Sequence, residues 1–298
     1  MNSFSKFAVH CALIATSLLL AGCQKKPEVR YSETLARNAL MALPFPDWAP
    51  TGSAQVQAVS LYPTTDVPSE AAAAVVHVEV SPVYVVRLDD THAALVTQVL
   101  PVDENNRPYD GHAHSGMIGA YFFEHSAAGW RMTDRQDFVT TSGVGGNIGT
   151  TGITKLGEGH FAVTAQWGSC WQGYCGRWLV VVGLQGNEAT LLNSGIALSV
   201  DNDGARGACS ALSGGDPRAA KEADAEKHEC LDIQSKWKFQ GNRLLVSYEG
   251  RLSKLGENGE LLPTRKIQEQ AIYEATPGKL TLISGRNPVP DFFSNGPP

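Results

Sequence analysis

After its first 23 residues, the chain has no long apolar run. No stretch there approaches the roughly 18 consecutive apolar residues of a membrane-spanning helix, so we expect neither a channel nor a transporter. With 43% apolar and 18% charged residues, the chain has enough apolar side chains for a large core. This composition excludes a disordered protein, a collagen-like fibre and a long coiled coil.

An excess of positive charge is also missing. The 24 basic residues are outnumbered by 30 acidic ones, which gives a net charge of -6, and the basic residues form no cluster. Proteins that bind nucleic acid use Lys and Arg to neutralise phosphates. We therefore expect no nucleic-acid partner.

Two common catalytic motifs are absent from the sequence, the G-x-S-x-G nucleophile elbow and the H-E-x-x-H zinc helix. The Gly-rich stretch 143–149 lacks the Lys-Ser/Thr pair of a phosphate-binding loop, and no helical pattern follows it. We interpret it as a connection. A catalytic triad assembled from distant loops stays open, because its members need not be adjacent in sequence.

The N-terminus has the three parts of an export signal. A short n-region contains Lys6, an apolar stretch covers residues 7–20, and Leu20-Ala21-Gly22-Cys23 follows. The apolar stretch is too short to cross a membrane comfortably. The small residues before Cys23 let the chain enter a peptidase cleft in extended form, and Cys23 supplies a thiol for lipid attachment.

This tetrapeptide resembles the lipobox of bacterial lipoproteins, and the resemblance covers only the first two dozen residues. It implies a signal peptide over residues 1–22, a diacylglyceryl group on Cys23, cleavage before Cys23 and acylation of the new amine. Two or three acyl chains hold a protein firmly on a bilayer, at about 0.8 kcal/mol per buried methylene.

The residue after the lipid-bearing cysteine bears on the compartment. In the enterobacterial sorting pattern an Asp there favours the inner membrane, whereas this chain has Gln24. The resemblance therefore implies a lipid anchor in the outer membrane with the protein on the periplasmic face, the inner membrane and the cell surface being the alternatives. Residues 24–298 resemble no family that we recognise.

Four cysteines remain after Cys11 leaves with the signal peptide and Cys23 takes the lipid. An exported chain meets an oxidising compartment, so these four favour two disulfides, for which the sequence alone allows three connectivities. We predict that Cys170 pairs with Cys175 and Cys209 with Cys230, because each pair brackets a plausible loop. A metal or redox site is the rival interpretation, although such sites favour C-x-x-C spacing and Cys170 and Cys175 have four residues between them.

Two parts follow the signal peptide, and the second contains an insertion. Residues 23–74 are expected to form the lipid anchor, a short helix over 33–43 with Ser32 as its N-cap, and an extended linker rich in proline. Residues 75–298 are expected to form a β-rich periplasmic domain, because apolar residues alternate with polar ones there. An insertion over 201–233, closed by the second disulfide, is expected to carry a short helix over 216–228.

The β-rich part contains a weak internal repeat. Three segments, 83–132, 152–192 and 235–282, share the order strand, tight turn, strand, variable loop, strand, Gly turn, strand. The repeat predicts an all-β antiparallel meander of about twelve strands in three four-stranded units. A sandwich or an open barrel is the favoured arrangement. Propeller-like blades are the alternative, and three blades are fewer than the roughly four to eight that propellers have.

Two short stretches contain possible metal ligands. In an extended chain His112 and His114 lie on one face, within reach of one zinc ion, and Asp103, Glu104 or Asp110 is available as a third ligand. Polar surface is the plainer interpretation of this loop. The stretch 201–204, Asp-Asn-Asp-Gly, begins like a calcium loop but has Ala205 and Leu212 where the EF-hand pattern needs oxygen ligands, which favours a simple turn over a looser calcium site.

Four aromatic residues surround the first predicted disulfide: Trp167, Trp171, Tyr174 and Trp178. Rigid aromatic faces of this kind contact glycans and proteins. The alternative is that they pack over the disulfide and cap the core. Trp171 and Tyr174 lie inside the loop and are the better candidates for ligand contact.

The sequence leads to three functional hypotheses. The first is a membrane-anchored lipoprotein that acts without catalysis as a binding module for an envelope protein or glycan. The second is a metal-assisted periplasmic hydrolase that uses His112 and His114 with zinc or calcium. The third is an inhibitor or immunity-type lipoprotein that blocks a toxin or a wall-degrading enzyme.

Overall fold

The computed structural model describes residues 30–61, 74–202, 204, 209, 229–254 and 264–289. The signal peptide, Cys23 and the helix expected over 216–228 lie outside these residues. Within them the chain is almost entirely β-strand, with one short helix, α1 (Arg37–Met41). No helix in the described part is long and apolar enough to cross a bilayer.

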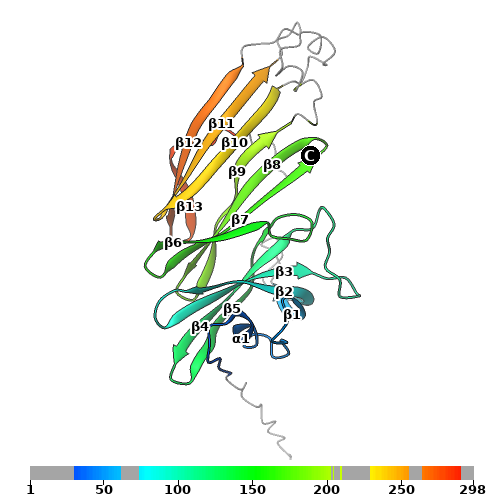
Figure 1. Cartoon of the computed structure of the whole chain (residues 1–298), viewed down its shortest axis with the longest axis vertical. Coiled ribbons are helices and arrows are strands. Elements are labelled where there is room, and N and C mark those ends of the chain that lie inside the picture. Colours follow the sequence, from blue (N-terminus) through cyan, green and yellow to red (C-terminus); the bar gives the residue numbers. More distant parts are fainter. Residues whose placement is uncertain are drawn as a thin grey trace, which may run out of the picture.

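Thirteen strands form two antiparallel sheets (Figure 1). The first sheet has the order β1-β2-β3-β4-β5 and the second the order β13-β12-β11-β10-β9-β8-β7-β6, so within each sheet every strand lies beside its neighbour in the chain. The strands are β1 (Gln55–Leu61), β2 (Ala74–Arg87), β3 (His92–Pro101), β4 (Gly116–Ser126), β5 (Gly129–Ser142), β6 (Thr150–Gly157), β7 (His160–Trp171), β8 (Tyr174–Gln185), β9 (Glu188–Asp201), β10 (Glu229–Gln240), β11 (Arg243–Lys254), β12 (Arg265–Thr276) and β13 (Lys279–Gly285).

The predicted meander of three four-stranded units is confirmed as β2–β5, β6–β9 and β10–β13. Tight turns with glycine at positive φ separate the strands, as at Gly241 (φ 59°) and Gly278 (φ 79°). The propeller-like alternative is wrong. Units two and three are joined edge to edge, with Asp201 of β9 opposite Asp232 of β10, and form one sheet of eight strands in place of two separate blades.

The structure differs from the sequence prediction in the segment before residue 75. Helix α1 begins at Arg37, and Ser32 is not its N-cap, because the backbone of Ser32 pairs with Trp130 of β5 and keeps the chain extended there. The expected linker contains β1, which pairs with β2 along its whole length from Gln55 to Leu61. This segment is therefore part of the first sheet.

Three apolar cores hold the layers together, and the first sheet is buried on both faces. On its outer face, Leu40, Met41, Phe45 and Trp48 pack against residues that include Leu95, Tyr121 and Phe123. On its inner face, residues that include Val96, Ile118 and Phe122 pack against Val163, Val180 and Val182 of the second sheet. A third core is formed by side chains of the eight-stranded sheet itself. In it, Leu179 and Val181 of β8 share a cluster with Leu244, Val246 and Tyr273.

A charged cluster ties the N-terminal segment to the first sheet. Asp137 of β5, only 7% exposed, accepts hydrogen bonds from the Tyr121 hydroxyl (2.8 Å) and from Arg135 Nε (2.8 and 3.0 Å to its two oxygens). Arg135 also donates to the carbonyl oxygen of Pro44 (3.1 Å), and its guanidinium lies 5.0 Å from the ring centroid of Phe45. Burial and the neighbouring Asp137 carboxylate raise the pKa of Tyr121, so its hydroxyl stays a donor.

Candidate functional site

The β7–β8 hairpin has a stripe of aromatic side chains on the face that is turned toward the first sheet. Trp167 stands opposite Trp178, and Trp171 stands opposite Tyr174 at the tip. The two indoles at the base stack with their centroids 4.5 Å apart, and Trp167 packs against the core between the sheets. Trp171 is 41% exposed. One stripe therefore runs from the core out to solvent.

The geometry of the hairpin tip is tightly fixed. The turn consists of Gln172 (φ 49°) and Gly173 (φ 84°), two residues in left-handed conformation as a tight two-residue hairpin requires. Directly before and after the Trp171–Tyr174 pair, Cys170 and Cys175 form a disulfide. The predicted pairing is present, and so is that of Cys209 with Cys230. Trp171 and Tyr174 thus lie at the tip of a hairpin that the Cys170–Cys175 disulfide cross-links.

The histidine loop between β3 and β4 lies against this tip. His112 stacks on Trp171, with 6.1 Å between the ring centroids and 13° between the planes, and its Nε2 lies 3.2 Å from the Ser169 hydroxyl. His114 stacks on Tyr109 of its own loop, with 4.9 Å between the centroids and 15° between the planes. We call these five residues, Tyr109, His112, His114, Trp171 and Tyr174, the aromatic surface.

The Gly-rich stretch 143–149 supports the histidine loop. The Gly146 amide donates to the carbonyl oxygen of His114 (2.9 Å). A Cβ atom on Gly146, whose φ is 68°, would lie 2.4 Å from the Tyr109 carbonyl oxygen. Only glycine permits this close approach. The stretch 143–149, expected to be a connection, thus also supports the backbone of the aromatic surface.

His112 and His114 contact different partners and do not face a common metal position. His112 faces Ser169 and Trp171, whereas His114 lies on Tyr109. Across the part of the chain that the structure describes, no three His, Cys, Asp or Glu side chains form a group able to hold a metal ion, and Asp110 is exposed beside the histidines. In the possible calcium loop, buried Asn202 accepts a hydrogen bond from the Leu231 amide (2.9 Å), which is a structural use of its oxygen.

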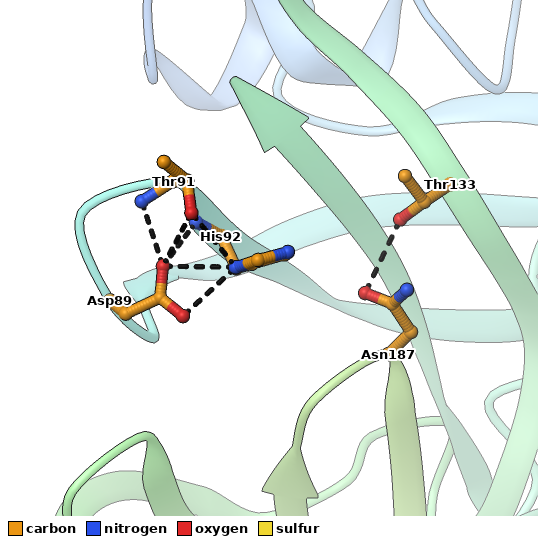
Figure 2. Close-up of polar contacts among 5 residues, drawn as sticks. All are labelled: Asp89, Thr91, His92, Thr133 and Asn187. Atoms are coloured by element: carbon orange, nitrogen blue, oxygen red, sulfur yellow. Dashed lines mark hydrogen bonds and ion pairs between the residues drawn. The ribbon is translucent and has the colours of Figure 1, made fainter. Parts of the chain in front are cut away.

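Sequence reasoning missed a second polar cluster, at the turn between β2 and β3 (Figure 2). The Asp89 carboxylate accepts hydrogen bonds from the backbone amides of Thr91 and His92, both at 2.7 Å, and lies 2.9 Å from His92 Nδ1. In Figure 2 the His92 ring points toward Thr133 and Asn187, which hydrogen-bond to each other at 3.4 Å. The spacing Asp-x-Thr-His was the available signal, since Asp side chains bond to amides two residues onward.

This turn predicts a pH dependence. The backbone amide of Thr91, followed by contacts with His92, lowers the pKa of Asp89 from 3.8 to about 2. A lowered pKa stabilises the fold at pH values above the ordinary carboxyl range, and the stabilisation disappears as the pH falls from about 4 to about 2. We therefore expect the amide NMR signals of Thr91 and His92 to shift as the pH is lowered, with a midpoint near the pKa of Asp89, about 2.

An Asp89→Asn variant should lose this pH response, because an amide does not titrate. Asp90→Asn is the matched control: it removes the same charge from the next residue, which is also exposed. An unchanged midpoint in Asp89→Asn, or an equal effect of both variants, would contradict the assignment.

No family model, curated protein or solved structure matches the chain. The functional argument therefore rests on the aromatic surface itself.

Proposed function

We propose that this protein is a lipid-anchored periplasmic binding module, and that the aromatic surface is the face that contacts its ligand in the bacterial envelope. The observation that carries the proposal is Trp171, 41% exposed, on a disulfide-linked hairpin tip and stacked on His112. An exposed large aromatic side chain held in one position supplies contact area at a low cost in conformational entropy.

Two features of the sequence support the compartment. The lipobox-like Leu20-Ala21-Gly22-Cys23 supplies an anchor, and two disulfides suit an oxidising space outside the cytoplasm. An outer-membrane anchor would leave the β-rich domain in the periplasm, tethered by the residues after Cys23.

Lipid attachment predicts a clear labelling result. In a bacterial host supplied with radioactive palmitate, the full-length protein should be labelled and should lose residues 1–22. The Cys23→Ser variant should carry no label and keep its full precursor mass, because it lacks the thiol that takes the lipid. Cys11→Ser is the control and should behave as the unmodified protein; label that persists in Cys23→Ser would refute the anchor.

Binding itself is tested with the full-length protein in bilayer nanodiscs. We expect saturable binding to washed envelope fragments from a diderm bacterium that lacks this protein. Trp171→Ala should weaken this binding at least tenfold. Leu282→Ala, which removes another exposed apolar side chain far along the chain on β13, should leave it unchanged. Absence of binding, or equal binding by both variants, would overturn the proposal.

A further inference from the structure

We propose that the ligand of the aromatic surface is a neutral oligosaccharide, with one pyranose ring lying on the indole of Trp171. This inference rests on the proposed function and names the chemical class of the ligand. Four properties of the surface support it: its shape, its charge, the small number of exposed large apolar side chains, and the polar groups beside the indole.

The shape suits a flat ligand with one apolar face. Trp171 and His112 are stacked only 13° from parallel, so the imidazole fixes the plane of the indole, and 41% of Trp171 remains exposed. A pyranose ring presents C–H bonds on its faces and hydroxyl groups around its rim. These C–H groups are weakly positive and are attracted to the negative face of an aromatic ring.

The charges of the surrounding loops disfavour an anionic ligand. The stretches 102–115, 143–149 and 170–175 contain one basic residue, Arg107, and no lysine. Arg107 forms an ion pair with Asp103, with 3.1 Å between Nη2 and the carboxylate. Binding of phosphate groups, whether in nucleic acid or lipid headgroups, needs unpaired cations. This arrangement therefore argues against an anionic ligand.

The surface exposes few large apolar side chains. Within these loops the large exposed apolar side chains are Tyr109 and Trp171, each 41% exposed. Stable protein interfaces bury about 800 Å² on each partner and involve roughly 20–30 residues a side. Small polar ligands instead bind to a few aromatic side chains with a few placed polar groups.

Polar groups stand beside the indole where sugar hydroxyls would reach. The Ser169 hydroxyl points along the same face of β7 as Trp171, two residues away, and contacts His112 Nε2 at 3.2 Å. Serine hydroxyls and the imidazole nitrogen each donate or accept, which matches hydroxyl groups that also do both. The disulfide and the tight turn hold these groups in place before the ligand arrives.

The test uses calorimetric titration of the full-length protein in nanodiscs with chitotetraose and, separately, with cellotetraose. We expect saturable binding of at least one of them. Trp171→Ala should weaken it at least tenfold, Trp171→Phe should restore part of the affinity, and Leu282→Ala should have no effect. If neither sugar binds, or if Trp171→Ala binds as tightly as the unmodified protein, the inference is wrong.

A second arm separates this inference from the proposed function. Envelope fragments are digested with a protease before the binding measurement. Binding that survives digestion and depends on Trp171 supports a glycan ligand. Binding that depends on Trp171 but disappears after digestion indicates a protein partner, which overturns the oligosaccharide and leaves the binding module standing.

Discussion

Replacing Asp137 with alanine is expected to lower the free energy of unfolding by about 3 kcal/mol. The carboxylate is almost fully buried and is the shared acceptor for Tyr121 and Arg135. Its loss leaves a buried hydroxyl without this acceptor and a partly buried guanidinium without its counter-charge. Because 32% of the Arg135 side chain remains exposed, water offsets some of the penalty, which places the effect at the low end of that for a broken buried ion pair.

The measurement is urea unfolding followed by tryptophan fluorescence. Asp134→Ala is the matched control, since Asp134 is an exposed residue of the same type on the same strand, and it should change the stability by less than about 0.5 kcal/mol. Asp137→Asn should fall between the two, because the amide keeps the size and one acceptor oxygen. Equal midpoints for Asp134→Ala and Asp137→Ala would show that the cluster does not tie the N-terminal segment to the sheet.

Removing the disulfide between Cys209 and Cys230 has a second large expected effect. The two sulfurs close a chain segment with a sequence separation of 21. In the chain-entropy model this closure contributes about 3 kcal/mol, since the open loop gives the unfolded chain many more conformations. Both cysteines are buried, and the Leu231 amide beside Cys230 donates to Asn202, so the bridge also holds the start of β10 beside the end of β9.

The comparison variant is the Cys170→Ser, Cys175→Ser pair. Its loop has a sequence separation of only 5, so its loss should cost about 2 kcal/mol, less than the loss of the longer loop. Urea unfolding of both double variants decides the order. A larger effect at the hairpin tip than at Cys209 and Cys230 would show that native strain or residual structure, and not loop entropy, sets the contributions.

The strand pattern was predictable because its signals are local. Alternation from Phe161 to Trp167 specifies a strand with one polar and one apolar face, and a glycine in the turn marks where the chain reverses. The sequence does not predict β1, because the local signals are weak there. It is an edge strand next to prolines, and Val59 is its one fully buried residue among those whose burial is described, so its apolar pattern is weak.

The candidate site was predictable in its parts and not in its assembly. The sequence indicates ligand contact for Trp171 and Tyr174, and metal binding for His112 and His114. His112 meets Trp171 only because the β3–β4 loop and the β7–β8 tip lie at the same end of two stacked sheets. Sheet stacking depends on contacts between residues far apart in sequence, and no spacing within one loop encodes it. The Asp137 cluster escaped for the same reason, since the sequence shows charges in a strand without showing that one is buried.

The order of strands has a consequence for how the chain reaches its fold. Within each sheet every strand pairs with the one that precedes it in the chain. Apart from the long connection between β9 (ending at Asp201) and β10 (beginning at Glu229), pairing therefore closes short loops, whose entropy cost is small. A chain synthesised from its N-terminus can form each hairpin as soon as the second strand of that hairpin is available, which shortens the time that an unpaired edge is exposed to aggregation.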